Sequence, residues 1–231
     1  MENILLPSRV SVEAGQNDRE AQLVIEPCFH GYGTTVGNAL RRVLLSSLVG
    51  AAVTSVKIKG FTHEFQAIPN VKEDVLQVIL NMKQVRVRLH TDEPVKLELH
   101  VKGKNVVTAG DIQANADVEI ANPELELCTL TDDSASFDME LIVERGRGFS
   151  PTEERDTSGH DLGTIAIDAL FSPVRNVSYR VEETRVGEIT DYDKLILTIE
   201  TDGTITPREA VEEATKILMS YFSIIVGQVG G

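Results

Sequence analysis

A chain of 231 residues, with 42% hydrophobic and 25% charged side chains, is long enough for one or two globular domains with a sizeable core. Its 36 acidic residues outnumber its 22 basic residues, and a net charge of -14 disfavours direct binding to a phosphate backbone. The sequence has no apolar run of about 18 residues and no signal-peptide pattern, so we expect a cytoplasmic protein with no membrane partner.

The first predicted elements are a strand, a glycine-rich turn and a helix. Residues 21–27 have the pattern of a strand, and the glycines and threonines of CFHGYGTT follow it. A helical pattern begins near Thr35 and is expected to end at Gly50. Apolar residues at intervals of three and four predict its core face, made of Val36, Ala39, Leu40, Val43, Leu44, Ser47 and Leu48.

The opposite side of this helix carries a leucine beside two arginines. At about 100° per residue, Leu45 is expected to lie away from the apolar stripe, with Arg41 and Arg42 one turn before it. This combination indicates a docking surface for another protein. A solvated helix face with one stray leucine would give the same pattern, so the residues alone leave both interpretations open.

A strand and a second helix are predicted next. β-Branched residues dominate residues 51–59, which favours a strand. Asn70 is placed to cap the helix, and Glu73 is placed to complete a capping box. The apolar stripe of this helix contains Val71, Val75, Val78, Ile79 and Met82, and is widened by Leu76 and Leu80. Such a broad stripe predicts that the helix is covered on two sides.

The middle of the chain predicts a β-rich module. Between about residues 85 and 144, short strand-like runs alternate with Gly, Asn, Asp and Pro. Residues 145–163 are poor in apolar side chains, so we expect a long surface loop there. Strand patterns return in 165–185 and 194–203, with a tight turn at Asp202 and Gly203.

The strongest local signal marks the start of the last helix. Thr206, Pro207 and Glu209 supply a cap, a first-turn proline and a capping-box acid. Apolar residues cover one face and then surround the far end, namely Ala210, Val211, Ala214, Ile217, Leu218, Met219, Tyr221, Phe222, Ile224 and Ile225. So much apolar surface predicts packing against another subunit, most simply a second copy of the chain.

No motif supports catalysis, a cofactor or a metal site. The glycines within 31–37 form GxGxxxG rather than GxGxxG and no GK[ST] follows, so a tight turn and close helix packing at Gly37 explain them better. The pair HE at 63–64 lacks the second histidine of HExxH, and no serine lies in a GxSxG elbow. Cys28 and Cys128 have no zinc-ligand spacing and are expected to be reduced structural thiols.

Five segments together resemble the alpha-subunit family of bacterial RNA polymerases. They are GTTVGNALRRVLLSSLVGAAVTSVKIKG, HEFQAIPNVKEDVLQVILNMK, VERGRGFSP, FSPVRNVSYRVEETRVG and DYDKLILTIETDGTITPREAV, in the family's order and spacing over about residues 20–222. The resemblance implies an α+β fold. Both chain ends, 1–49 and 174–231, would form a dimerising α/β subdomain, and residues 50–173 an inserted β-rich subdomain. Because the chain stops at VGQVGG, we expect the family's carboxy-terminal DNA-binding domain to be absent.

The resemblance also implies a function. The chain would be a non-catalytic subunit, without a cofactor, of a nucleotidyltransferase, DNA-directed RNA polymerase. It would form a homodimer on which the beta and beta-prime subunits assemble for transcription, in the cytoplasm and at the nucleoid. An organellar origin stays open.

Family contacts can be carried over position by position. Those to the beta subunit fall on Arg41, Arg42 and Leu45. Candidates for the beta-prime side are Lys83, Ile167, Asp168 and Arg175. The expected dimer interface consists of Val36, Leu40, Val43, Leu44, Leu218, Tyr221, Phe222 and Ile225.

Two alternatives are considered. Archaeal and nuclear polymerase assembly subunits have a related fold and act as heterodimers, but the uninterrupted bacterial motifs argue against them. A small dinucleotide-dependent enzyme would depend on the strand, glycine turn and helix near Gly31, and it would show saturable cofactor binding.

Overall fold

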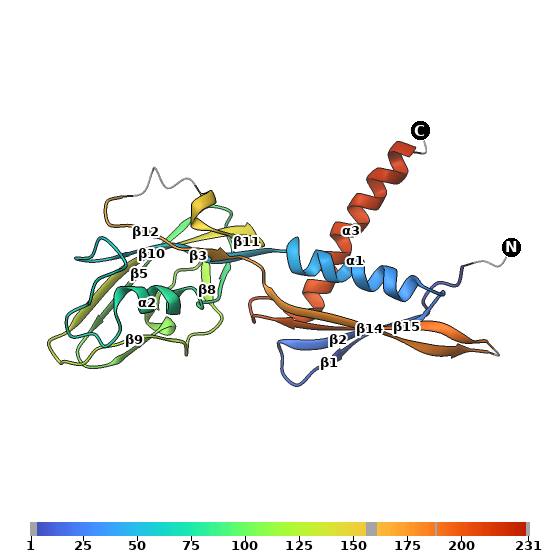
Figure 1. The fold of residues 1–231 in the computed structure, drawn as a ribbon, viewed down its shortest axis with the longest axis horizontal. Helices are drawn as coiled ribbons and strands as arrows, with labels where there is room; N and C mark the ends of the chain where they lie inside the picture. The colour runs from blue at the N-terminus through green and yellow to red at the C-terminus, as the bar shows by residue number, and fades with distance from the viewer. Residues whose placement is uncertain (1–3, 156–160, 188, 230–231) are drawn as a thin grey trace. The chain divides into compact units, whose positions relative to one another are not determined.

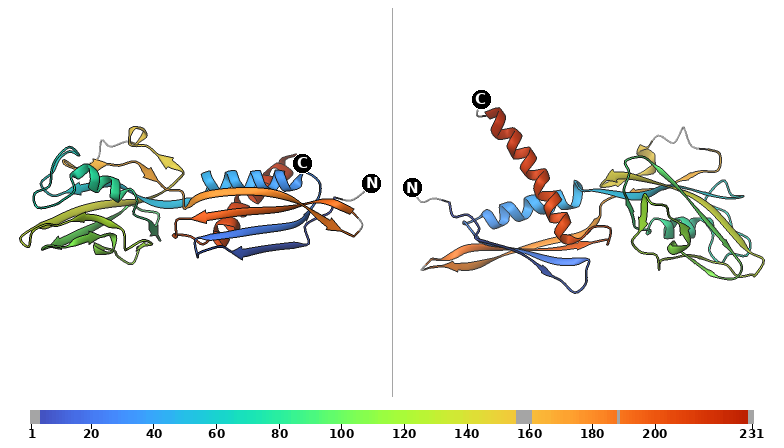
Figure 2. Two further views of the ribbon diagram at one scale, coloured as in Figure 1. Left: turned by 60° about the horizontal axis from the view of Figure 1, so that its bottom comes forward. Right: turned by 180° about the vertical axis from the view of Figure 1, so that it is seen from behind.

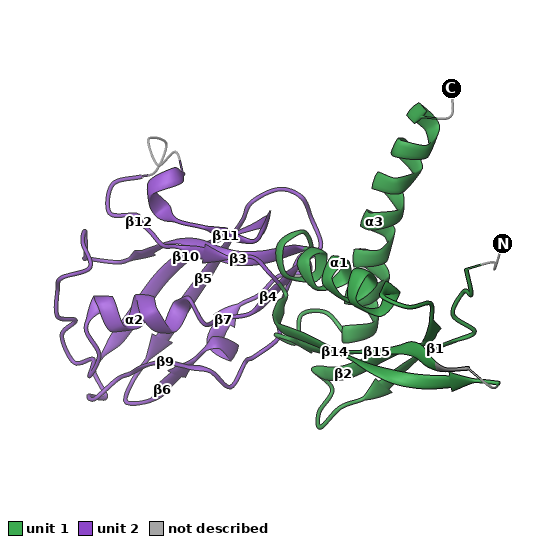
Figure 3. Ribbon diagram, turned by 45° about the vertical axis from the view of Figure 1, so that its right-hand side comes forward, with its two compact units in different colours: residues 1–48, 173–231 green, residues 49–172 purple. Residues whose placement is uncertain are grey.

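The chain forms two compact units. A computed structural model describes residues 4–155, 161–187 and 189–229. One unit consists of Met1–Leu48 with Pro173–Gly231, and the other of Val49–Ser172 (Figure 3). These boundaries lie one residue from those that the resemblance implies. The mixture of helices and mostly antiparallel strands confirms the α+β fold class.

The first unit is built on a four-stranded antiparallel sheet. Its order is β1-β2-β15-β14, with β1 at Arg9–Ala14, β2 at Glu20–Cys28, β14 at Val174–Val186 and β15 at Ile189–Thr201 (Figure 1). The central pair joins distant parts of the chain, because Leu23 of β2 lies opposite Leu197 of β15. Both chain ends therefore contribute to one sheet.

Two helices pack on one face of this sheet. They are α1, Tyr32–Ser46, and α3, Pro207–Val229. The buried core between helices and sheet contains Leu23, Leu40, Leu44, Leu48, Val174, Val177, Leu197, Ile199, Ala210 and Ala214. Only the first half of α3 contributes buried residues, and its second half extends away from the sheet (Figures 1 and 2).

The start of α3 confirms the predicted capping box. The backbone N–H of Glu209 donates to Thr206 Oγ1 at 3.2 Å, and the Glu209 carboxylate accepts from the Thr206 N–H at 3.0 Å. These reciprocal bonds satisfy two backbone donors that a helix start otherwise leaves unpaired.

Glycines allow α1 to lie close to the sheet. A Cβ atom at Gly37 would lie 2.8 Å from side-chain atoms of both Leu195 and Tyr179. The close approach predicted for Gly37 is therefore confirmed, although its neighbours are side chains and not backbone. The helix starts at Tyr32, three residues before the predicted position, because Gly31 adopts a φ of 78° that glycine tolerates best.

The second unit contains a seven-stranded sheet of order β7-β5-β10-β3-β4-β8, with β12 also paired to β3. The strands are β3 Val49–Ile58, β4 Val87–Leu89, β5 Val95–Lys102, β7 Ile112–Gln113, β8 Val118–Ile120, β10 Ser136–Arg147 and β12 Ile165–Ala166. Two small sheets pair β6, Val106–Thr108, with β9, Glu126–Thr129, and β11, Phe149–Ser150, with β13, Ala169–Leu170. The β-rich prediction for this region is confirmed.

Helix α2, Val75–Met82, starts later than predicted. Asp74, not Asn70, is the N-cap, and its Oδ1 accepts from the Gln77 N–H at 2.7 Å. Asn70 instead has a φ of 60°, and Glu73 accepts hydrogen bonds from the backbone N–H and hydroxyl of Thr129. The capping-box prediction was wrong because Glu73 is bound by a distant strand.

The prediction of a long surface loop at 145–163 was also partly wrong. Strand β10 continues to Arg147, and Phe149 of β11 pairs with Leu170. A short 3-10 turn follows at Thr152–Glu154. Residues 156–160 of the predicted loop lie outside the described residues.

Both cysteines are buried and free. Burial raises the pKa of the Cys28 thiol, and it raises the pKa of Cys128 to about 12. Both thiols are therefore protonated at neutral pH and poorly nucleophilic, as expected of structural cysteines.

A histidine joins two carboxylates on the sheet of the second unit. His100 of β5 lies opposite Asp138 of β10, with its Nδ1 2.8 Å from that carboxylate and its Nε2 3.2 Å from Glu98. The Asp138 and Glu98 carboxylates raise the pKa of His100, and the bond to His100 lowers the pKa of Asp138. Lys59 lies 3.7 Å from the other Asp138 oxygen.

Replacing Gly37 by valine should destabilise the first unit by about 1–3 kcal/mol, because the added side chain overlaps Leu195 and Tyr179. All four tyrosines lie in the first unit and the chain has no tryptophan, so tyrosine fluorescence during urea unfolding reports on that unit. Asn38→Val, at an exposed position of the same helix, is the control. Equal unfolding midpoints for both variants would contradict this account of Gly37.

Replacing His100 by glutamine should reduce the stability of the second unit in a pH-dependent way. The raised pKa of His100 stabilises the folded state fully at pH values below 6.5, the pKa of this side chain in the unfolded chain. The stabilisation is lost as pH rises through the pKa of His100 in the folded state. The lowered pKa of Asp138 stabilises the folded state at pH values above the pKa that this carboxyl has in the unfolded chain. That stabilisation is lost as pH falls through the pKa of Asp138 in the folded state.

Urea unfolding followed by circular dichroism should therefore separate His100→Gln from the parent chain at about pH 5.5 and much less at about pH 9. His90→Gln, at another exposed histidine, should show no such dependence. A His100→Gln effect of the same size at both pH values would mean that the ion pairs contribute nothing.

Candidate functional site

The turn before α1 does not have a free anion site. The Gly33 N–H at the start of the helix donates to Asp193 Oδ2 at 3.0 Å. A phosphate would use such helix-start N–H groups, and here a carboxylate of the chain already occupies one. A Cβ at Gly33 would also lie within 3.1 Å of Asp193 and Val181, so the glycine serves close packing.

Two of the predicted dimer residues lie inside the first unit. Leu40 is 5% exposed and Leu44 is completely buried, both in the core between α1 and the sheet. Their side chains have almost no surface left for a partner, which corrects that part of the prediction. Val36, Val43 and Leu218 are half-buried and pack against the same core.

The residues predicted to contact the beta subunit differ in exposure. Arg42 is exposed, and Arg41 is exposed while its Nε donates to the Val177 carbonyl at 3.0 Å. Leu45 is half-buried and packs against the core, so the expectation that it points away from the apolar stripe was wrong. The face of α1 that contacts the core is therefore broader than predicted and includes Leu45.

Arg42 lines a groove of about 790 Å³ in the first unit. The groove lies between α1, β14 and α3, and its lining consists of Thr34, Thr35, Asn38, Ala39, Arg42, Val43, Tyr179 and Leu218. Four of these eight residues, Thr34, Thr35, Asn38 and Arg42, are polar. Such an open groove can hold a chain segment of another protein.

The second half of α3 is an exposed apolar surface. Its large apolar side chains are Met219, Tyr221, Phe222, Ile224, Ile225, Val226 and Val229, each exposed by more than half. Three of them, Tyr221, Phe222 and Ile225, were expected at a dimer interface from the sequence. We call this set the α3 surface.

The second unit brings three predicted residues together. Lys83, Ile167 and Asp168 line a groove of about 150 Å³, together with Glu64, Leu76, Ile79, Thr152, Ile165 and Ala166. Ile167 is only 2% exposed, so it supports the groove from the core and its side chain cannot be a partner contact. The Lys83 ammonium lies 3.0 Å from Asp168 Oδ2.

Asp168 also accepts hydrogen bonds from Thr152. The backbone N–H and the hydroxyl of Thr152 donate to Oδ1 at 2.9 and 3.2 Å. The Thr152 N–H, followed by Lys83, lowers the pKa of Asp168, so this carboxylate stays ionised at neutral pH. Sequence reasoning missed Thr152, because a contact between a turn and a distant loop has no periodic pattern.

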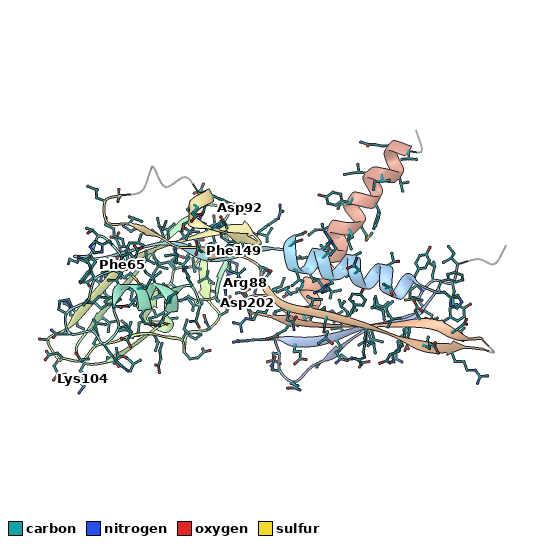
Figure 4. The ribbon with its side chains drawn as sticks, in the orientation of Figure 1. Phe65, Arg88, Asp92, Lys104, Phe149 and Asp202 are labelled. Atoms are coloured by element: carbon teal, nitrogen blue, oxygen red, sulfur yellow. The ribbon has the colours of Figure 1, made fainter. Side chains whose placement is uncertain are left out.

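The outward face of α2 carries two exposed leucines. Leu76 and Leu80 are 40% and 43% exposed, so the prediction that this helix is covered on two sides was wrong within the chain. Phe65, in the segment before α2, is 77% exposed and is labelled in Figure 4. Leu76 and Leu80 are the two residues that widened the predicted apolar stripe, whereas Phe65 was not singled out from the sequence.

Arg175 is exposed on β14 and belongs to the first unit. It therefore lies in a different unit from Lys83 and Asp168. Among the described residues, no group of three or more His, Cys, Asp or Glu side chains could hold a metal ion. No helix in the described ranges is long and apolar enough to cross a membrane.

Comparison with known proteins gives consistent matches. Residues 56–172 match the family model of the RNA polymerase Rpb3/RpoA insert domain. The chain is 49% identical over 215 residues to DNA-directed RNA polymerase subunit alpha of Alkaliphilus oremlandii, covering 93% of this chain and 68% of that protein. It is 48% identical to the same subunit of Symbiobacterium thermophilum, covering 95% and 70%, and of Desulfitobacterium hafniense, covering 96% and 70%. Together with the two-unit α+β fold, these matches show that the chain belongs to the family of bacterial DNA-directed RNA polymerase alpha subunits.

Proposed function

We propose that this chain is the non-catalytic assembly subunit of its polymerase, which is a nucleotidyltransferase. Two copies form a homodimer, and the dimer binds the beta and beta-prime subunits. The observation that carries the proposal is the α3 surface, which extends beyond the core of its own unit. The place of action is the bacterial cytoplasm, at the nucleoid once the polymerase is assembled.

The size of the α3 surface supports a permanent partner. Seven large apolar side chains, each more than half exposed, lie within residues 219–229 of one helix, and large exposed apolar patches mark interaction sites on proteins. An identical copy is the simplest partner, because a two-fold axis brings the same patch of both chains together. The groove beside Arg42 continues this surface through Leu218.

The charge distribution also favours contact at α3. Each chain carries a net charge of -14, so two copies repel one another at long range. Residues 217–229 contain no Asp, Glu, Lys or Arg. Contact through this segment therefore removes apolar area from water without bringing acidic side chains together.

Arg42 is the residue best placed for the beta subunit on the first unit. Its guanidinium is exposed at the edge of the groove, and a planar guanidinium can donate paired hydrogen bonds to a carboxylate. Arg41 contributes less, because its Nε is already bound to the Val177 carbonyl. Leu45 supports α1 from the core side.

For beta-prime we propose the groove of the second unit. The exposed leucines of α2 and the Lys83 ammonium provide an apolar ridge with a polar end. Arg175, in the first unit, is proposed as a separate contact. The acidic chain itself is not expected to bind DNA or a cofactor.

Light scattering on the purified chain should give twice the 25.3 kDa mass of one copy, and addition of separately prepared beta subunit should add one beta per dimer. Phe222→Glu with Ile225→Glu should give single chains, because charges would enter the apolar contact. Val106→Glu, at an exposed apolar residue of the second unit, is the matched control and should leave the dimer intact. A parent chain that stays monomeric and ignores beta would refute the scaffold.

Arg42→Ala should leave a folded dimer and weaken capture of the beta subunit by ~10-fold or more, as expected for a lost charge-assisted hydrogen bond. Beta capture is measured by titration of labelled dimer. Arg208→Ala, which removes an exposed arginine from the first turn of α3, should have no effect. Equal capture by both variants would exclude Arg42 from the beta contact.

A further inference from the structure

The carboxylate of Asp168 is almost fully engaged inside its own unit. Oδ1 accepts from the N–H and the hydroxyl of Thr152, and Oδ2 accepts from the Lys83 ammonium. A carboxylate has about four lone-pair sites, so roughly one is left for a partner. A carboxylate that bound another subunit through its charge would have more of its acceptor sites available to that subunit.

The bonds of Asp168 fix the segment 149–155. At one end of this segment, Phe149 pairs with Leu170. At the other end, Arg155 donates to the carbonyls of Thr54 and Ile167. Asp168 binds Thr152 between these two attachments, so it holds the middle of the segment that forms one side of the groove.

Asp168 also sets the position of Lys83. This lysine is the C-cap residue of α2, and it follows Leu76 and Leu80 at helical spacings of seven and three. The ion pair keeps its ammonium at the groove that Leu76 also lines, with both partners only about a third exposed. An ammonium has three donors, so Lys83 keeps hydrogen-bonding capacity for another group.

We propose that Asp168 is a positioning residue that organises this surface for beta-prime and does not itself contact it. The contact is made by Leu76, Leu80 and Lys83, which fit a segment carrying aliphatic side chains and a carboxylate. This inference rests on the proposed docking of beta-prime at the second unit. It changes the role that the resemblance implies for Asp168 from direct contact to support.

Three variants of the full chain separate positioning from contact. Asp168→Ala removes the acceptor of Thr152 and the partner of Lys83. Asp168→Asn keeps an oxygen that can accept from Thr152 but has no charge. Glu154→Gln neutralises an exposed acid of the same segment and is the matched control. Each dimer is first loaded with beta subunit, which tests its fold, and then titrated with beta-prime, while hydrogen exchange is measured over residues 149–155.

For Asp168→Ala we expect exchange of residues 149–155 and the beta-prime dissociation constant to rise ~10-fold or more, with beta capture unchanged. Asp168→Asn should keep the exchange of residues 149–155 within about threefold of the parent chain, because the bond to Thr152 remains. It should weaken beta-prime capture less than Asp168→Ala does, because only the ion pair to Lys83 is lost. Glu154→Gln should change neither.

Two results would overturn the proposal. If Asp168→Asn still weakens beta-prime capture in a chain that already carries Lys83→Met, while residues 149–155 stay protected, the carboxylate itself meets the partner. If Asp168→Ala loosens the segment without weakening capture, the segment plays no part in docking. Failure of the parent dimer to capture beta-prime at all would instead remove the docking function on which the inference rests.

Discussion

The pairing of β2 with β15 is the contact on which the rest of the first unit depends. Leu23 and Leu197 meet at its centre, under α1, although the whole second unit separates them in sequence. Without this ladder the sheet would divide into two hairpins, and neither α1 nor α3 would have a continuous apolar surface to cover. Leu48 and Val174, which flank the second unit closely, belong to the same core, so the ladder also brings together the points where the chain leaves and returns.

Local signals in the sequence predicted the features that depend on neighbouring residues. The Thr206 capping box needs only residues three apart, and it is present as expected. The strands of the β-rich region follow from alternation, and the apolar end of α3 follows from composition. The partner of each strand did not follow, because pairing depends on residues that are far apart in the chain.

The wrong predictions involve contacts that neighbouring residues do not determine. Periodicity placed Leu40 and Leu44 on the core face of their helix, where they lie. Their assignment to the dimer interface came from the resemblance, and burial inside the unit leaves these side chains almost no surface for a second copy. Asn70 and Asp74 are both good capping residues, and the choice was decided by Thr129, which binds Glu73 from a distant strand. The Asp168 site depends on contacts from α2 and from the turn at Thr152, and no spacing along the chain encodes that meeting.

The two proposed partner surfaces differ in the free-energy cost of their exposure to water. The α3 surface is apolar and uncharged, so exposure is unfavourable and a copy of the chain is expected to cover it early. The groove of the second unit has an ion pair and hydrogen bonds that are already satisfied, with only a narrow apolar ridge, so it is stable when exposed. The surface whose exposure to water costs the most free energy should be covered first. Under the proposed function we therefore expect dimerisation to precede capture of a large subunit.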